Sequence, residues 1–129
     1  MEEIPDDARR FQASVLADAV EDWQPIWAAH AFSRTVLPGL SEPARDLLIR
    51  STLEILFKSQ LITFFMASWD APHTQPLEVL NVLSASDVHE LIREGGWHRD
   101  FEAHEEVPWY MATPQGEERY YQLSPNEFL

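Results

Sequence analysis

The stretch Arg45–Ala67, RDLLIRSTLEILFKSQLITFFMA, decides the fold. It is the longest apolar run in the chain, and its hydrophobic pattern changes part-way along. Up to Ser59 the apolar residues recur at the three- and four-residue spacing of a helix. From Leu61 onward the run is rich in β-branched and aromatic residues, which favour strands. The sequence therefore predicts a helix over residues 42–59, a strand over 61–67, and a buried centre formed by both.

Two further helices are expected before this stretch. Apolar side chains at four-residue spacing predict a helix over residues 7–22. Pro25 indicates the start of a second helix, 24–35, because a first turn tolerates the missing N–H of proline. The Pro38-Gly39 pair ends this helix, and Ser41 is a good N-cap for the next one. The first half of the chain is therefore predicted to be a three-helix unit.

Short elements are expected after the strand. A proline opens a short helix over residues 76–83, and Ser84 caps a helix over 85–94. Residues 97–106 are polar and acidic and are expected to form a loop. A second strand is predicted over 107–113. It would pair with the first strand as a small antiparallel sheet.

The segment after residue 113 has two interpretations. Thr113 and Pro114 have the chemistry of a helix N-cap followed by a first-turn proline. Alternatively, residues 114–117 form a turn and residues 119–123 return as a strand. The combination of cap and proline favours the helix.

The order of the elements is three helices, a strand, a connection, a second strand and a helix, with YMATPQGEERYY at residues 110–121. This order resembles the winged helix-turn-helix domains of bacterial regulators. In that family the strand after the recognition helix pairs with a second wing strand, and a segment Y-x-L-T-P-x-G-x-x-x-Y opens the next helix. The matching positions here are Tyr110, Thr113, Pro114, Gly116 and Tyr120.

The resemblance implies an α+β, mostly helical fold with a winged-helix-like core. The length of 129 residues indicates one domain. Residues 7–67 would form the helical core and first strand, and 107–129 the second strand and C-terminal helix. Residues 68–106 would be an insertion with short helices, far longer than an ordinary wing.

The charge of the chain narrows the class of partner. The formal net charge is −13, from 22 acidic and 9 basic residues. Residues 59–129 hold 12 of the acids and 3 of the bases, which gives this half a net charge of −9. Nucleic acid is a disfavoured partner because its phosphates need Lys and Arg. An acidic field would instead attract a basic protein.

Cysteine usage and hydropathy bear on the compartment. The chain has no cysteine, which excludes disulfides and fits a reducing compartment. The segment MEEIPDD lacks the apolar region of a signal peptide. The run 53–67 is too short to span a membrane and is interrupted by Lys58 and Gln60. We therefore expect a cytoplasmic protein without a membrane segment.

Residue types that carry catalysis are present without a recognisable motif. His89, His98 and His104 lie among carboxylates, but HELIR at 89–93 lacks the second histidine of HExxH. No serine sits in a GxSxG context, and no glycine-rich phosphate loop occurs. We expect a protein that is not an enzyme, with no catalytic residue, no metal and no cofactor.

A binding surface is the remaining candidate. Aromatic residues alternate with acids over residues 94–110, a pattern that suits a basic protein partner because rings supply buried area and acids supply steering. The candidate partner-binding residues are Glu94, Trp97, Asp100, Phe101, Glu102, Glu105, Glu106, Trp109 and Tyr110. The alternative for Trp97 and Trp109 is a place in the core.

The sequence thus favours a non-enzymatic, acidic interaction module. An immunity or inhibitor protein that binds a basic nuclease toxin is one such protein. The alternative is a winged-helix DNA-binding regulator, in which the resemblance assigns DNA contact to Arg45, Arg50 and Lys58. The sequence leaves a homodimer open.

Overall fold

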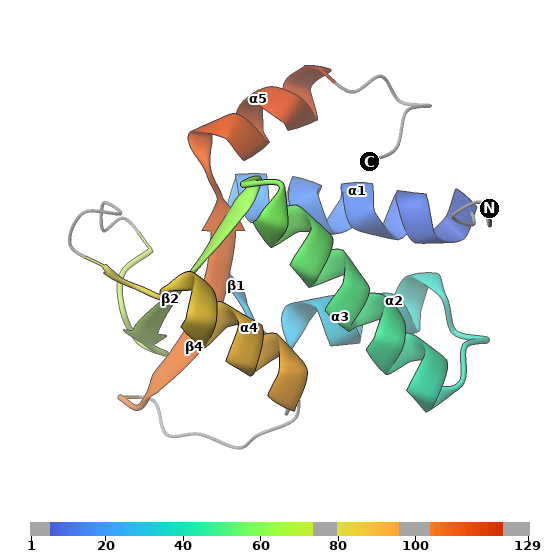
Figure 1. Ribbon diagram of the computed structural model, residues 1–129, viewed down its shortest axis with the longest axis horizontal. Coiled ribbons are helices and arrows are strands. Elements are labelled where there is room, and N and C mark those ends of the chain that lie inside the picture. The colour runs from blue at the N-terminus through green and yellow to red at the C-terminus, as the bar shows by residue number, and fades with distance from the viewer. Residues whose placement is uncertain (1–5, 74–79, 96–103, 123–129) are drawn as a thin grey trace.

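The computed structural model describes residues 6–73, 80–95 and 104–122, and in these ranges it holds five helices and a four-stranded antiparallel sheet (Figure 1). The elements are α1 (Asp6–Glu21), β1 (Gln24–Pro25), α2 (Ala28–Val36), α3 (Glu42–Lys58), β2 (Ile62–Ser68), β3 (Asn81–Val82), α4 (Ala85–Glu94), β4 (Glu106–Ala112) and α5 (Pro114–Gln122). The predicted α+β class, mostly helical with a small antiparallel sheet, is confirmed. No described helix is long and apolar enough to cross a membrane.

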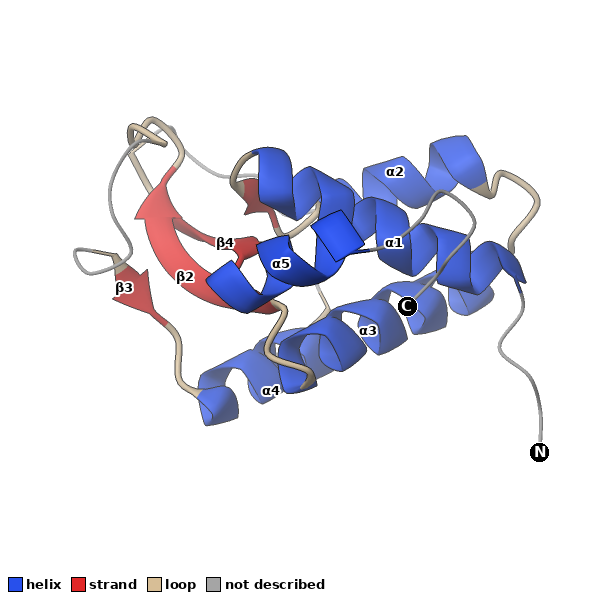
Figure 2. Cartoon of the chain, turned by 90° about the horizontal axis from the view of Figure 1, so that it is seen from above, coloured by secondary structure: helices blue, strands red, loops and turns tan. Residues whose placement is uncertain are grey.

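The centre of the sheet is the predicted antiparallel pair of β2 and β4. The strand order is β1-β4-β2-β3, and the β2–β4 register runs from Ile62 opposite Ala112 to Ser68 opposite Glu106. These strands are more than 35 residues apart in sequence, so the chain between them must leave the sheet and return. Figure 2 shows α1, α2 and α3 together on one side of this sheet.

The junction between α3 and β2 explains the change of period inside Arg45–Ala67. The Gln60 N–H donates to the Phe57 carbonyl and the Leu61 N–H to the Leu56 carbonyl, each at 2.9 Å. These two bonds form a Schellman motif, which needs a left-handed residue after the helix. Gln60 takes that place with φ 63°, although glycine is the usual residue there. The predicted boundaries of this helix and strand are confirmed to within one residue.

The second helix starts later than predicted. Gln24–Pro25 is the edge strand β1, and the helix begins at Ala28. Pro25 pairs with Trp109 although it has no N–H to donate, and the Ile26 N–H donates to the Pro108 carbonyl at 3.0 Å. Proline is tolerated in edge strands because no second neighbour needs its N–H. The proline therefore marks a strand edge here and not a first turn.

The predicted helix over residues 76–83 is wrong at its described end. Asn81 and Val82 form β3 and pair with Met66 and Phe65 of β2. The free edge of β2 supplies backbone partners that a short isolated helix lacks. Residues 76–79 lie outside the described ranges, as does most of the predicted loop 97–106, whose last residue begins β4.

The predicted caps are present. The Ser41 hydroxyl accepts from the Ala44 N–H at 3.3 Å, and the Ser84 hydroxyl from the Asp87 N–H at 3.2 Å. The Thr113 hydroxyl accepts from the Gly116 N–H at 2.9 Å. The segment after Thr113 is therefore a helix, α5, and the returning strand is wrong.

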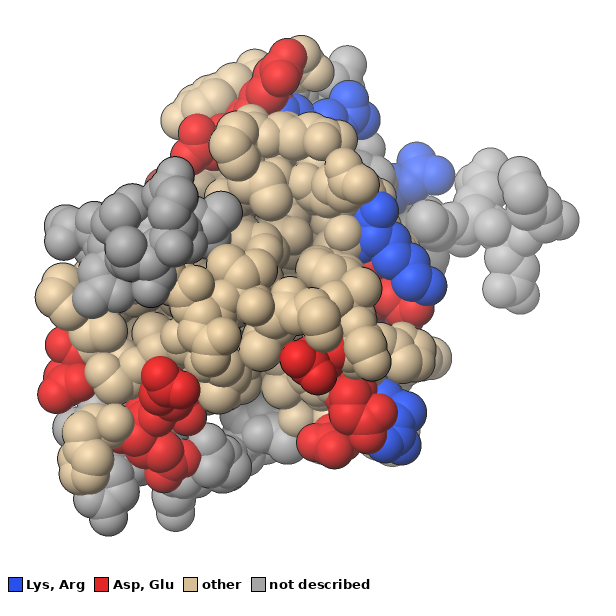
Figure 3. Space-filling model, turned by 60° about the vertical axis from the view of Figure 1, so that its left-hand side comes forward, with Lys and Arg blue, Asp and Glu red and all other residues tan. Residues whose placement is uncertain are grey.

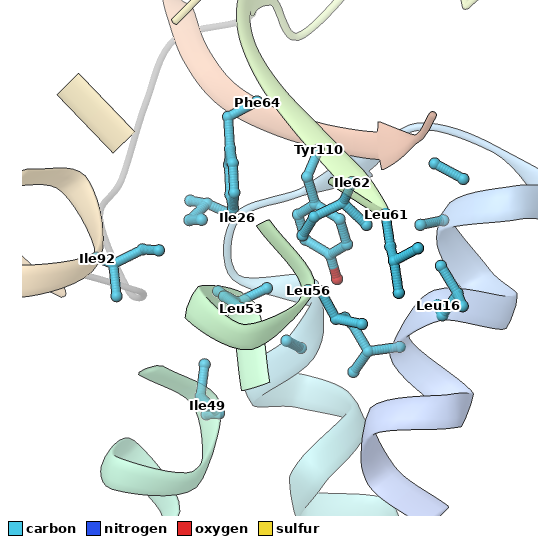
Figure 4. Packing of buried hydrophobic residues seen from close by; sticks show 14 of the residues in the cluster. Leu16, Ile26, Ile49, Leu53, Leu56, Leu61, Ile62, Phe64, Ile92 and Tyr110 are labelled. Atoms are coloured by element: carbon cyan, nitrogen blue, oxygen red, sulfur yellow. The ribbon is translucent and has the colours of Figure 1, made fainter. Parts of the chain in front are cut away.

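The core has two parts, one on each face of the sheet. On the helical face, Phe64 and Tyr110 point toward Leu53 and Leu56 of α3, with Leu16 of α1 beside them (Figure 4). The opposite face carries a smaller cluster of Trp23, Phe65, Ala67, Val107 and Trp109. Successive strand residues point to opposite faces, so β2 and β4 carry hydrophobic residues at most of their positions because both faces are covered.

Candidate functional site

The smaller cluster reaches the surface through Trp69, the residue directly after β2. The Trp69 ring stacks on the Trp109 ring at a centroid distance of 5.3 Å and an interplanar angle of 17°. Trp69 is 42% exposed, whereas Trp109 is 2% exposed. The Trp27 ring lies 5.6 Å from the Trp69 ring. A partly exposed indole thus rests on a buried one.

His73 extends this stack toward the end of α1. Its ring stacks on Trp23 at 4.7 Å and meets Trp109 edge-on at 5.1 Å. His73 Nδ1 lies 3.0 Å and 3.1 Å from the two carboxylate oxygens of Asp22. The same carboxylate accepts from the Trp23 N–H at 2.8 Å. The pair holds the turn after β2 against α1, and we call Trp27, Trp69 and His73 the aromatic surface.

Acidic side chains border the aromatic surface. Asp22, Asp70 and Glu106 are exposed, and we call them the acidic rim. The Ser68 hydroxyl donates to Asp70 at 2.8 Å, and Ser68 pairs with Glu106 across the sheet. These contacts bring acids from three separate segments, 21–27, 68–73 and 104–109, to one end of the sheet. None of the three segments contains Lys or Arg.

Charge is unevenly distributed over the face seen in Figure 3. The centre of this face has no charged side chain, Asp and Glu side chains lie below and above it, and Lys and Arg side chains lie along its right-hand side. An exposed ring beside carboxylates is suited to a cationic side chain, because the ring face and the acids attract the same charge. The aromatic surface can therefore hold Arg or Lys of a partner.

Two predicted partner-binding residues are buried. Trp109 and Tyr110 are 2% and 1% exposed. Trp109 Nε1 donates to the Ala67 carbonyl at 3.1 Å, and desolvation, with a smaller contribution from Asp18, raises the pKa of Tyr110 above its ordinary value. The expectation that these rings are exposed anchors is wrong, because β4 is a central strand with both faces covered. Trp109 instead supports the exposed Trp69.

The other predicted partner-binding residues lie in different parts of the chain. Glu106 is exposed in the acidic rim, and Glu105, the residue before it, is half-buried. Glu94 ends α4, which packs on α3 and contributes nothing to the aromatic surface. Trp97, Asp100, Phe101 and Glu102 lie outside the described residues.

The predicted DNA-binding residues are engaged in internal contacts. Arg45 is 3% exposed and donates to the Ser33 hydroxyl at 3.2 Å and to the Leu40 carbonyl at 3.0 Å. Its assignment to a DNA surface is therefore wrong. Arg50 donates to Asp46 at 2.7 Å, and Lys58 pairs with Glu54. Both of these basic residues lie on the surface of α3, each beside an acid of the same helix.

No three His, Asp or Glu side chains gather closely enough to hold a metal ion within residues 6–73, 80–95 and 104–122. His89 is exposed on α4 and His104 is exposed in the turn before β4. His98 is outside these ranges.

The sequence reasoning missed Asp22, Trp69, Asp70 and His73. A signal was available in SWDAPH, residues 68–73, where an aromatic residue and an acid stand in a turn directly after a buried strand. Functional side chains are frequent in loops that a rigid sheet supports. The contact of His73 with Asp22 joins residues 51 positions apart, and no local pattern signals it.

Comparisons with protein-family models, curated proteins and solved structures found no match for this chain.

Proposed function

We propose that this protein is a non-enzymatic interaction module that binds a basic protein through the aromatic surface and the acidic rim. The observation that carries the proposal is the exposed Trp69 ring stacked on the buried Trp109 ring between carboxylates. An immunity or inhibitor protein for a basic toxin such as a nuclease is the class of function that this chemistry suits. The cysteine-free chain fits action in the cytoplasm.

Rigid support makes Trp69 an efficient anchor. Its ring is held by Trp109 and lies close to Trp27, so little side-chain entropy is lost when a partner covers it. Tryptophan is among the residues most enriched at the energetic centres of interfaces. A guanidinium or ammonium group over this ring would gain cation–π attraction.

The acidic rim would increase the rate of association with the partner and the selectivity of binding. Asp22, Asp70 and Glu106 lie at the same end of the sheet as the anchor, and the net charge of −13 extends the attraction over a longer range. Charges at the edge of an interface mainly increase the association rate and reject partners of like charge. The binding should therefore weaken as salt rises.

The test compares proteins captured from a native lysate of the source organism by four immobilised variants. These are the wild type, Trp69→Ala, the double variant Asp70→Lys/Glu106→Lys, and the control Glu117→Lys/Glu118→Lys. The control makes the same change of charge on α5, outside the acidic rim. We expect wild type and control to retain the same basic protein, released by salt, and the other two variants to lose it.

The captured protein is then purified and titrated. We expect Trp69→Ala to weaken its binding by about 2 kcal/mol, roughly 30-fold, as for a central interface residue. Equal retention by all four variants, or capture of an acidic protein only, would contradict the proposal.

A winged-helix DNA-binding protein is the second candidate. It is supported by the capped α5 that follows Thr113-Pro114 and by the antiparallel pair formed by β2 after α3. The burial of Arg45 and the pairing of Lys58 with Glu54 weigh against it. Retention of DNA fragments at low salt that is lost in Arg50→Gln/Lys58→Gln would favour this candidate instead.

A further inference from the structure

A cavity of about 510 Å³ lies between α3 and α4, which pack side by side (Figures 1 and 2). Its volume is in the range of sites that hold small organic molecules. None of the residues of the aromatic surface lines it. The cavity is therefore separate from the aromatic surface.

The apolar wall of the cavity comes from both helices. Phe57 and Leu47 line it from α3, and Val88 and Ile92 line it from α4. Leu47 is 66% exposed, an unusual position for a large aliphatic side chain. An apolar ligand would cover this side chain and the others.

Arg50 lines the cavity and joins its two helices. Its Nε donates to Asp46 at 2.7 Å, and its Nη1 donates to the main-chain carbonyl of Arg93 at the end of α4. The Arg93 side chain also lines the cavity. The guanidinium groups of Arg50 on α3 and Arg93 on α4 therefore lie at the same end of the cavity.

The lining charge is opposite to the charge of the protein. Arg50, Lys58 and Arg93 line the cavity, against Glu54 as the one acid among its lining residues. These three are a third of the 9 Lys and Arg residues in a chain with a net charge of −13. Each of these cations has an acid partner, Asp46, Glu54 or Glu90, which an anionic ligand would share or exchange.

Existing ion pairs do not prevent such binding. Arg93 pairs with Glu90, and both side chains are more than half exposed. Exposed pairs of this kind contribute little and exchange readily with other anions. A ligand carboxylate could take a bidentate place on a guanidinium group.

We propose that this cavity binds a single-chain anionic amphiphile, an alkyl carboxylate. The carboxylate lies at the Arg50 and Arg93 end, and the tail runs along Phe57, Val88 and Ile92. The site is independent of the proposed partner surface. The volume of about 510 Å³ suits one alkyl chain better than a two-chain lipid.

Titration calorimetry with dodecanoate, below its micelle concentration, tests the proposal. Dodecyltrimethylammonium has the same tail and the opposite charge. We expect dodecanoate to bind at least about tenfold more tightly, although the protein as a whole is acidic. Equal or tighter binding of the cationic amphiphile would overturn the proposal.

Four variants locate the two ends of the ligand. Arg93→Gln removes one guanidinium but keeps the carbonyl that Arg50 binds, so it should weaken dodecanoate binding about tenfold. Ser51→Phe places a ring in the middle of the cavity and should abolish binding. Arg34→Gln on α2 and Arg119→Gln on α5 change residues that do not line the cavity, and both should bind as the wild type does.

Circular dichroism establishes that each variant is folded before titration. Wild-type affinity in both Arg93→Gln and Ser51→Phe would show that dodecanoate binds elsewhere and would overturn the assignment. The variant Asp70→Lys/Glu106→Lys should bind dodecanoate normally, which separates this site from the partner surface.

Discussion

The indole of Trp69 lies parallel to the indole of Trp109, 5.3 Å away, with the first ring 42% exposed and the second 2% exposed. Two tryptophans 40 positions apart thus form one unit with an outer and an inner ring. The inner ring is fixed by β4 and by its own hydrogen bond to the Ala67 carbonyl. The outer ring can be changed without opening the core, which allows binding and stability to be measured separately.

Substitution of these two tryptophans should have unequal effects on stability. Trp109→Ala would empty a buried site and should lower the free energy of unfolding by about 3–5 kcal/mol. Trp69→Ala removes a ring that is already partly in water and should cost about 1 kcal/mol. Urea unfolding followed by circular dichroism measures both. A loss as large for Trp69→Ala as for Trp109→Ala would contradict the separation of outer and inner rings.

Gly116→Ala should destabilise the protein severely. A Cβ at Gly116 would lie 1.9 Å from the Leu61 carbonyl oxygen, which is main chain and cannot rotate away. The same carbonyl accepts from the Thr113 N–H at 3.0 Å, so α5 starts directly against the end of α3. We expect a loss of about 2–3 kcal/mol or more in the free energy of unfolding, measured by thermal or urea denaturation.

The matched control is Gly39→Ala. A Cβ at Gly39 meets nothing within 4 Å, and this residue is exposed between α2 and α3. This variant should unfold within about 0.5 kcal/mol of the wild type. Equal effects of the two substitutions would refute the close approach of α5 to Leu61.

Glu42→Gln should destabilise the contact between α2 and α3 in a pH-dependent way. Glu42 Oε1 lies 3.1 Å from Arg34 and 3.6 Å from Arg45, and Oε2 lies 3.3 Å from His30. Desolvation acts to raise the pKa of Glu42, but the hydrogen bond to His30 and the charges of Arg34, His30 and Arg45 outweigh it and lower the pKa. The free energy of unfolding at neutral pH should fall, because the buried Arg45 loses its counter-charge.

The sign of the pH dependence follows from the lowered pKa. The carboxylate of Glu42 stabilises the fold above its ordinary pKa of 4.5, and this contribution disappears as pH falls through the lower folded value. The difference between wild type and Glu42→Gln should therefore be full at pH 7 and absent at about pH 2. A difference that persists unchanged in acid would show that the charge of Glu42 is not its cause.

Asp18→Asn should stabilise the protein at neutral pH. Desolvation, followed by the nearby charge of Glu21, raises the pKa of Asp18 above its ordinary value of 3.8. A raised folded pKa favours the protonated form, so the carboxylate lowers stability as pH rises through that value. The melting temperature of Asp18→Asn should exceed that of the wild type at pH 7 and match it at about pH 3. A melting temperature of Asp18→Asn below that of the wild type at pH 7 would contradict the raised pKa of Asp18.

Local chemistry predicted most of the fold. The caps Ser41, Ser84 and Thr113 each act through a residue three positions away, so sequence alone places three helix starts correctly. The apolar pattern predicted both central strands for the same reason. The predicted start of α2 and the described end of the helix predicted over residues 76–83 were wrong, because β1 and β3 depend on backbone partners offered by β4 and β2.

For the candidate site, the sequence predicted the types of residue but not which residues form it. Acids and aromatic rings were expected together, and Glu106 is in the rim, but Trp109 is beneath the surface and Trp69 was missed. Alternation along a strand says which residues share a face and not whether that face is covered. The predicted position of Arg45 was also wrong. A charged residue on a helix was expected at the surface, but Arg45 is buried and donates to Ser33 and Leu40.

The sequence by itself determined the helix and strand at Arg45–Ala67, the capped helices and the acidic character of the chain, because spacing, caps and charge act locally. Only the tertiary structure decided which tryptophan is exposed, that Asp22 meets His73, and that Arg50 reaches the end of α4. Each of these depends on pairing of β2 with β4 or packing of α3 on α4. Contacts between segments far apart in sequence form only when the whole core closes around them.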